Sequence, residues 1–421
     1  MSLPLRLFLK SIVRQGCLSV TYANGETSTY GSDQAGSRIA VELADKSLEL
    51  ELMRDPEMVL GEAFAEGRLR VISGTIYGLL ELLFLNTRSD AGGQRLLEVL
   101  ELAQRTKERV VKSNTKRRSR QNVAFHYDLS PALYDLFLDP ERQYSCAYFE
   151  SPTMTLEAAQ VAKMRHLASK LALEPRQKVL DIGSGWGGLG IYLARSAGVD
   201  VTGVTLSTEQ HAESNARAKR QGLEQHVRFE LQDYRNVSAR YDRIVSVGML
   251  EHVGKDQFDT YFAKVAQVLE EDGVAVIHAI GQFDVPSPTN PWIEKYIFPG
   301  GYIPSLSEIV QSVERAGLMT TDIEVLRLHY AQTLRVWRKR FLARRHDAIQ
   351  LYDERFTRLW EFYLAASEIG FRYRGLMVFQ IQLAKRVDSL PIVRTYMTER
   401  EEEIRCADES RENRGEIRAA E

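Results

Sequence analysis

The distribution of apolar and polar residues changes along the chain, and its clearest pattern begins near residue 178. Short β-branched runs there alternate with helix-length segments, and these runs are KVLDI, DVTGVTL, HVRFEL, DRIVSV and GVAVIHAI. Strands that alternate with helices predict a parallel sheet covered by helices. We therefore expect an α/β domain, which we bound at residues 123–394.

The first 104 residues have a different texture. The run CLSVTYANGETSTYGS alternates apolar and polar positions around an Asn24-Gly25 turn signal, and DPEMVLGEAFAEGRLR has helical periodicity. This mixture predicts a smaller N-terminal mixed α/β domain over residues 1–104. In RLFLKSIVR, the apolar residues Leu5, Phe8 and Ile12 share one helical face. That face suits either a membrane surface or the domain's own core.

Two charged segments flank the predicted α/β domain. Residues 105–122 are strongly basic and predict a linker; the basic residues are Arg105, Lys107, Arg109, Lys112, Lys116, Arg117, Arg118 and Arg120. Residues 395–421 form a charged tail with few large apolar side chains, which predicts a frayed helix or disorder. We assign the tail no function.

Composition narrows the functional classes. The net charge of −2 provides no overall attraction to nucleic acid, and 44% hydrophobic residues suffice for packed cores. Three widely spaced cysteines fit a reducing cytoplasm and show no metal-ligand spacing, so we expect no metal site. We find no signal peptide, and VISGTIYGLLELLFL is too short and too interrupted to span a bilayer. Any membrane contact is therefore expected to be peripheral.

A glycine-rich loop is the first chemical motif. KVLDIGSGWGGLGIYLA places Gly183 and Gly185 between a strand and a helix, where backbone approaches a ligand closely. Asp181 at the strand end would pair with an ammonium or orient the loop. A turn without any ligand is the alternative. No acid follows at the spacing of a dinucleotide-binding fold, where Thr205 and Gln210 are the polar candidates instead. Asp233 is placed either to accept from an adenine amino group or to cap a helix.

Together with other segments, these residues resemble the cyclopropane-fatty-acyl-phospholipid synthases and the related mycolic acid cyclopropane synthases. The resemblance covers residues 120–385 and rests on HYDLS (126–130), QYSCAYF (143–149), VLDIGSGWGG (179–188), GVTLS, DRIVSVGMLEHVG (242–254), VIHAIG (276–281), WIEKYIFPGG (292–301) and HYAQTL (329–334). Ser184 departs from the cysteine of many members, at a side chain that cofactor binding does not need.

The resemblance implies a class I S-adenosylmethionine methyltransferase fold, Rossmann-like with a mostly parallel seven-stranded sheet. It assigns the cofactor contacts to Tyr144, Ser145, Gly183, Gly185, Thr205, Gln210 and Asp233, to which Asp181 is added from its place at the strand end. It also implies a bound bicarbonate, at the positions Cys146, Glu251, His278, Ile280 and Tyr330.

Each of these catalytic candidates has a structural alternative. Cys146 has no neighbour in sequence that would lower its pKa, so we interpret it as a wall of the anion site; a small buried hydrophobe is the alternative. For His278 the alternative is a core histidine, and for Glu251 an acid in the first turn of a helix; the surrounding IHAIG and GMLEHVG segments favour the functional interpretation of both. The aromatic residues Tyr144, Tyr148, Phe149, Trp292, Tyr296 and Tyr302 are candidates for a cation-stabilising wall, although aromatic residues more often pack in a core.

The function implied is methyl transfer to a cis double bond of an unsaturated phospholipid acyl chain, followed by deprotonation by bicarbonate and closure of a cyclopropane ring. C-methylation to a methylene- or methyl-branched fatty acid is the closest alternative. A nucleic-acid methyltransferase and a noncatalytic lipid-binding protein fit the sequence less well. We expect a cytoplasmic homodimer, peripherally associated with the inner face of the membrane and without a nucleic-acid partner.

Overall fold

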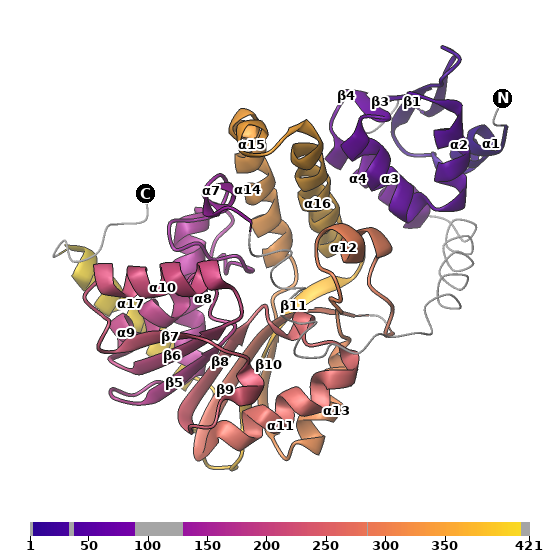
Figure 1. The fold of residues 1–421 in the computed structure, drawn as a ribbon. Coiled ribbons are helices and arrows are strands. Elements are labelled where there is room, and N and C mark those ends of the chain that lie inside the picture. The colour runs from indigo at the N-terminus through magenta and orange to yellow at the C-terminus, as the bar shows by residue number, and fades with distance from the viewer. Residues whose placement is uncertain (1–2, 33–37, 89–128, 284, 414–421) are drawn as a thin grey trace. The chain divides into compact units, whose positions relative to one another are not determined.

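The computed structural model describes residues 3–32, 38–88, 129–283 and 285–413. Contacts divide the chain into two compact units that are discontinuous in sequence (Figure 1). The first contains residues 1–111, 288–297 and 334–375, and the second contains residues 112–287, 298–333 and 376–421. The basic linker at 105–122 lies outside the described residues. The domain boundaries drawn from the sequence stay a prediction.

The second unit is built on a seven-stranded sheet in the order β10-β11-β9-β8-β5-β6-β7. The strands are β5 (Lys178–Ile182), β6 (Asp200–Thr205), β7 (Val227–Leu231), β8 (Tyr241–Val247), β9 (Leu269–Gln282), β10 (Met319–Val325) and β11 (Leu376–Ala384). Strands β5 to β9 pair in parallel, whereas β11 runs antiparallel to both β9 and β10. The predicted mostly parallel sheet of a class I methyltransferase fold is confirmed.

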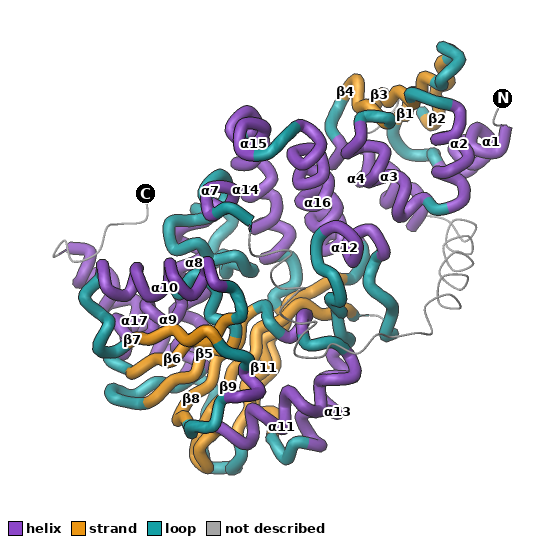
Figure 2. Tube along the Cα trace, in the orientation of Figure 1, coloured by secondary structure: helices purple, strands orange, loops and turns teal. Residues whose placement is uncertain are grey.

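Helices cover both faces of this sheet (Figure 2). One apolar cluster joins it to α11 (Phe258–Val268) and α13 (Leu306–Arg315), and another joins it to α8 (Leu156–Lys170) and α9 (Gly188–Ala197). The other elements here are α7 (Pro131–Tyr134), α10 (Thr208–Arg220) and three short 3-10 helices, Tyr234–Asn236, Leu250–His252 and Lys255–Gln257. Burial on both faces explains why the strands read as continuous apolar runs.

The charged tail forms a packed helix, α17 (Tyr396–Asn413), against α8 and α9. Tyr396, Met397 and Ile404 make apolar contacts, and polar contacts add to them: Tyr192 donates to Asp408 at 2.7 Å, and Arg400 donates to the carbonyl of Leu173 at 2.8 Å. The expectation of a frayed or disordered tail is therefore wrong for residues 396–413. It failed because specific hydrogen bonds add to an apolar face that is smaller than a packed helix usually has.

The first unit contains a four-stranded sheet in the order β2-β1-β3-β4. Its strands are β1 (Cys17–Thr21), β2 (Thr27–Gly31), β3 (Arg38–Leu43) and β4 (Leu69–Ser73), and its N-terminal helices are α1 (Leu3–Ile12), α2 (Lys46–Arg54), α3 (Pro56–Glu66) and α4 (Ile76–Arg88). The predicted mixed α/β character of this region is confirmed. On α1, Leu5 and Ile12 are buried, so the apolar face packs on the unit's own core.

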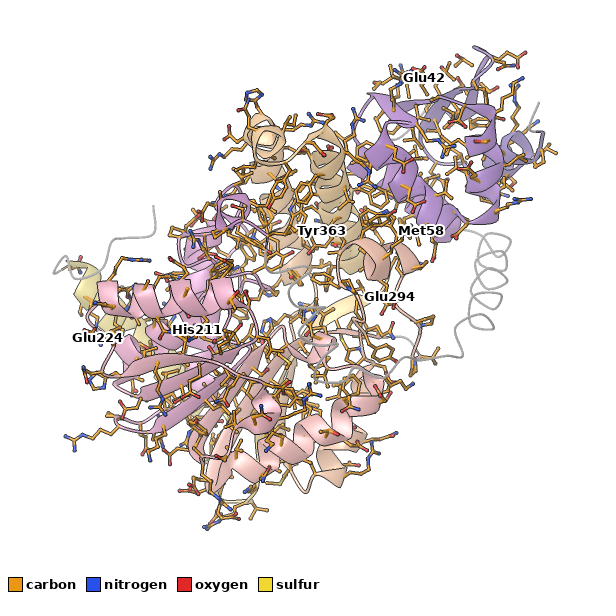
Figure 3. All side chains as sticks on the ribbon, in the orientation of Figure 1. Glu42, Met58, His211, Glu224, Glu294 and Tyr363 are labelled. Atoms are coloured by element: carbon orange, nitrogen blue, oxygen red, sulfur yellow. The ribbon has the colours of Figure 1, made fainter. Side chains whose placement is uncertain are left out.

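Later segments complete the first unit. They are α12 (Pro291–Tyr296), α15 (Arg345–Leu351), α16 (Glu354–Tyr373) and the greater part of α14 (His329–Ala343). Helix α16 packs against α3 and α4, and its buried Tyr363 is labelled in Figure 3. Among the described helices, none combines the length and apolar character needed to cross a bilayer.

Candidate active site

A cavity opens at the carboxyl ends of the parallel strands in the second unit. It is lined by residues from five places: the loop before α8, the glycine loop after β5, and the three segments that follow β6, β7 and β8. All eight residues predicted to bind the cofactor line it: Tyr144, Ser145, Asp181, Gly183, Gly185, Thr205, Gln210 and Asp233. Their individual contacts to a ligand stay predictions.

The glycine loop adopts backbone conformations that side chains disfavour. Gly183 and Gly185 have φ of 81° and 53°, in the left-handed region. At Gly188, a Cβ would lie 2.5 Å from the Glu141 carbonyl oxygen, so the helix start and the loop before α8 touch closely. These glycines keep backbone N–H groups of the loop close to the cavity, as an anion or nucleotide-like ligand requires.

Asp181 is a buried acid with an unmet hydrogen-bonding need. Its side chain is 2% exposed, and among the described residues its Oδ2 has no hydrogen-bond partner. Burial raises the pKa of Asp181 to about 7, opposed by the Lys163 ammonium. A buried carboxylate oxygen without a partner is costly, so this position favours a ligand that brings a donor, such as an ammonium group.

The polar side chains after β6 and β7 are held by local hydrogen bonds. Thr205 donates to Gln210 Oε1 at 2.9 Å, and Ser207 caps α10 by accepting from the Gln210 backbone N–H. Asp233 caps a 3-10 helix and receives two bonds from the Arg235 guanidinium, at 2.8 and 2.7 Å. The capping alternative for Asp233 is thus present in the structure, and its contact with an adenine amino group stays a prediction.

Segment 143–149 is fixed from several sides. The backbone N–H of Ala147 donates to Thr333 Oγ1 at 3.1 Å, and that of Phe149 donates to His329 Nδ1 at 2.9 Å. Thr333 and His329 lie in the first turns of α14, which also carries the buried Tyr330. This turn therefore holds the segment that contains Cys146.

Cys146 itself is buried, and its thiol donates to the Ala147 carbonyl at 3.3 Å. Burial raises the pKa of the Cys146 thiol well above its ordinary value. The thiolate is the nucleophilic form, so this environment does not suit nucleophilic catalysis.

Glu251 and Ile280 meet at the end of β9. The Ile280 backbone N–H donates to Glu251 Oε1 at 2.6 Å, while Oε2 is buried with no partner among the described residues. Burial raises the pKa of Glu251 to about 7. Two residues before Ile280, burial holds the pKa of His278 well below its usual value, so its ring is neutral. The Gln380 amide lies 3.1 Å from His278 Nδ1, which assigns the ring proton to Nε2.

The five predicted catalytic residues do not line the cofactor cavity. The structure brings Glu251 and Ile280 into contact, places His278 on the same strand, and links the Cys146 segment to the turn that carries Tyr330. Lys163 connects the two groups electrostatically, because it acts on the pKa of both Cys146 and His278.

Of the aromatic candidates, only Tyr144 lines the cavity. Tyr148 stacks between His166 and His329, with ring centroids 4.2 and 4.9 Å away, and Phe149 also packs on His329. Tyr302 donates to Glu308. In the first unit, Trp292 packs edge-on against Phe362, and Tyr296 donates to Glu62 at 2.6 Å. Core packing and hydrogen bonding thus account for the positions of the other rings.

Sequence reasoning missed several residues of this region. Arg142, Gln143, Trp186, Met249 and His252 also line the cavity. Lys163 lies fully buried behind it. A lysine among apolar neighbours inside a helical pattern was the one available signal for this position. The others follow from loop conformation, which the pattern does not predict.

The chain is similar to proteins that modify fatty acyl chains. The family model "Mycolic acid cyclopropane synthetase" matches residues 114–381, and a domain of unknown function (DUF7884) matches residues 5–94. The chain is 43% identical to a cyclopropane-fatty-acyl-phospholipid synthase of Escherichia coli strain K12, over 63% of this chain and 68% of that protein. It is 41% identical to a tuberculostearic acid methyltransferase of Mycobacterium tuberculosis, over 65% and 66% respectively.

Among solved structures, a mycolic acid cyclopropane synthase complexed with SAH and CTAB matches with a TM-score of 0.60 and 33% identity. The match covers 63% of this chain and 97% of that chain.

Proposed function

Because the chain belongs to the mycolic acid cyclopropane synthetase family, we propose that it is a cyclopropane synthase acting on unsaturated phospholipids. It is an S-adenosylmethionine-dependent methyltransferase that modifies acyl chains. The finer proposal is methyl transfer to a cis double bond, followed by deprotonation and ring closure. The observation that carries it is the buried Glu251–Ile280 pair, in which Glu251 has one carboxylate oxygen without a partner among the described residues and Ile280 shares its strand with the neutral His278.

The residues around the cavity fit S-adenosylmethionine. Its sulfonium supplies an activated methyl group when bound. Asp181 offers an unpartnered buried oxygen to an ammonium, and the glycine loop offers backbone N–H groups to a carboxylate. Tyr144 presents an aromatic ring to the same cavity, where its negative face favours a nearby cation.

The group formed by Glu251 with His278 and Ile280 of β9 fits a small hydrogen-bonding anion such as bicarbonate. Bicarbonate when bound would supply the base that removes the proton from the transferred methyl group. His278 holds a donor proton on Nε2, and the Ile280 N–H is a second donor, which Glu251 engages at 2.6 Å. The unpartnered Oε2 of Glu251 would accept a hydroxyl proton. Cys146 and Tyr330 would complete the wall of this site.

The chemistry explains why these groups are buried. An isolated double bond is a weak nucleophile, so the methyl donor must be held in line with it. The carbocation formed would react with water, so the site must exclude solvent. A buried thiol with a raised pKa stays protonated and does not compete as a nucleophile.

C-methylation without ring closure is the second candidate. It is favoured by the 41% identity to a tuberculostearic acid methyltransferase, which nearly equals the identity to the cyclopropane synthase. Both reactions begin with the same methyl transfer, and the position of the base relative to the cation decides between them.

We further propose that the protein works in the cytoplasm as a homodimer, bound peripherally to the inner face of the membrane. The requirement for a substrate inside a bilayer supports the membrane contact. The basic residues at 105–120 would attract anionic head groups, at about 1 kcal/mol for each well-placed charge.

The decisive experiment incubates the purified protein with S-adenosylmethionine and liposomes of a cis-monounsaturated phospholipid. The released acyl chains are then resolved by gas chromatography, mass spectrometry and proton NMR. A one-carbon mass gain with high-field cyclopropane resonances is expected. The same gain with vinylidene or branched-methyl signals would establish the second candidate, and no gain would refute both.

A further inference from the structure

A fully buried lysine lies behind the segment that carries the predicted cofactor contacts, and none of the roles above uses it. Lys163 comes from α8 and is 0% exposed. Its ammonium donates to the side-chain oxygen of Gln143, and to the Ser145 hydroxyl at 3.0 Å. Neither acceptor is a carboxylate. A buried ammonium held only by neutral groups is costly, so its presence requires a reason.

One face of α8 holds segment 143–145 by both backbone and side chains. Gln160, one turn before Lys163, donates its amide to the carbonyl oxygens of Gln143 at 3.2 Å and of Ser145 at 3.0 Å. Lys163 then fixes the side chains of the same two residues. Both Gln143 and Ser145 line the cavity, so α8 determines what this wall presents to a ligand.

The ammonium also acts electrostatically on two buried acids. Burial raises the pKa of Asp139 to about 6 and that of Asp181 to about 7, and for each acid Lys163 is the strongest opposing group. Burial lowers the pKa of Lys163 to about 8, against the attraction of Asp139, Cys146 and Asp181. The other titratable groups that act on this cluster are His278 from β9, Tyr261 from α11 and Glu141 from the loop before α8.

We propose that Lys163 is a positioning residue for the cofactor, acting through Ser145 and Asp181. Because the Ser145 oxygen accepts from Lys163, its own proton is directed to an acceptor on the cofactor. The buried cation also increases the ionised fraction of Asp181, the form that accepts from the cofactor's ammonium. This inference rests on the proposed places of Ser145 and Asp181 in the cofactor site, and it assigns Lys163 no contact with the lipid.

The test is binding of S-adenosylhomocysteine to a Lys163→Met variant by isothermal titration calorimetry. At pH 7 we expect Kd to rise by about fivefold or more, since a rise of one unit in the pKa of Asp181, from about 7, lowers its ionised fraction from about one half to about one tenth. With methyl transfer to liposomes as the readout, KM for S-adenosylmethionine should rise while kcat changes little. Binding is measured without lipid, so failure of this inference is distinguishable from failure of cyclopropanation.

Lys170→Met is the matched control. Lys170 lies on the same helix and is equally buried, but it pairs with Glu324 at 2.5 Å rather than with segment 143–145. Its replacement removes a buried ammonium of the same type and should leave Kd within about twofold, as expected for a site with no shared partner.

The pH dependence separates positioning from mere packing. The ratio of the variant Kd to the wild-type Kd should be largest below pH 7, where Asp181 is mostly protonated in the variant, and shrink as pH rises to 9. The reason is that Asp181 then ionises even without Lys163, while Lys163 of the wild type loses its proton. Titration of the ligand cancels in this ratio.

A folded Lys163→Met protein with wild-type Kd, or with a loss that is equal at all pH values, would overturn the proposal. If this variant does not fold, Lys163→Gln tests the contribution of the charge, because it removes the ammonium but keeps an N–H donor on a slightly shorter side chain. A Lys163→Gln protein with wild-type affinity at pH 7 would equally overturn it.

Discussion

Two acidic residues of the second unit, Asp181 and Glu251, are buried in surroundings that favour the neutral form of their carboxyl groups. Burial raises the pKa values of Asp181 and Glu251 to about 7, and each has one oxygen without a partner among the described residues. Such acids cost folding stability near neutral pH, where water would solvate them in the unfolded chain. Their burial is understandable if ligands supply the missing donors, so both acids are natural sites for mutation.

Replacement of Glu251 with Gln should stabilise the protein increasingly as pH rises from 5 to 8. The folded-state pKa lies above the unfolded one, so the native wild type binds more protons and loses stability as pH rises through this window. The amide has no charge to bury, so the gain over wild type should reach about 1 kcal/mol or more at pH 8. Urea unfolding at several pH values measures it.

The same Glu251→Gln protein should lose at least about tenfold in turnover of the lipid substrate, as expected for loss of a group in proton transfer. A variant that keeps both wild-type turnover and the wild-type pH profile of stability would show that Glu251 serves only as a hydrogen-bond acceptor for the backbone N–H of Ile280.

Gly188→Ala should weaken S-adenosylhomocysteine binding by about tenfold. The new Cβ would lie 2.5 Å from the Glu141 carbonyl oxygen and 2.6 Å from the Gln143 amide, so the cavity wall must shift. Gly190→Ala on the same helix is the control, because its Cβ meets only flexible apolar side chains at 3.2 Å and beyond. Equal affinity of the two variants would argue against close contact between helix and wall.

At the scale of elements, α17 is held by charged and polar contacts in addition to a few apolar contacts at Tyr396, Met397 and Ile404. His166 of α8 bonds to Glu401 of α17 at 3.1 Å and to Glu324 of β10 at 2.7 Å. Burial lowers the pKa of His166, but these two carboxylates outweigh it and raise the pKa above its ordinary value. The Tyr148 ring stacks on His166, so the same cluster supports the segment that carries the predicted site residues.

Glu401→Gln should therefore destabilise the protein more at pH 6 than at pH 9. A raised histidine pKa contributes stability that is complete below the unfolded value and is lost as pH rises through the folded one. The difference should be about 1 kcal/mol, measured by urea unfolding at both pH values. Glu402→Gln is the control, since the Glu402 carboxylate makes its contacts within α17, to Cys406 and Arg405. An equal effect of Glu401→Gln at both pH values would mean that His166 stays neutral.

At the scale of the whole molecule, access to a bilayer is the open requirement of the proposed reaction. The apolar residues Leu5 and Ile12 of α1 are buried in the first unit, so this face is not available to lipid. The basic segment 105–120 is the remaining candidate from the sequence, although it lies outside the described residues. A mainly electrostatic contact would weaken with salt.

Neutralising Arg117, Arg118 and Arg120 together should reduce sedimentation of the protein with anionic liposomes by severalfold, while S-adenosylhomocysteine affinity is unchanged. Adding about 0.5 M salt should reduce wild-type binding to a similar level, because the charges are then screened. Equal liposome binding by the wild type and the triple variant would discard this segment as the membrane contact.

The sequence by itself determined the α/β fold, its mostly parallel sheet and the cavity residues that lie at the ends of its strands. These follow from local rules: strand and helix periodicity is written in neighbouring residues, and parallel strands place their carboxyl ends at one edge. Asp181, the glycine loop and Asp233 each directly follow a strand or end one, so their convergence on one cavity was predictable.

Only the tertiary structure decided which distant groups meet. Glu251 reaches the N–H of Ile280, 29 residues away, and Lys163 reaches Ser145 from the next helix, with an orientation that no periodicity encodes. The tail folds as α17 because it makes hydrogen bonds with residues such as Tyr192 and His166, which lie more than 200 residues earlier in the sequence. The amphipathic pattern at the N-terminus fitted either a membrane surface or the domain's own core, and the burial of Leu5 and Ile12 in the structure favours the core. The physical reason is common to all: periodicity specifies a face, whereas its partner depends on how the whole chain packs.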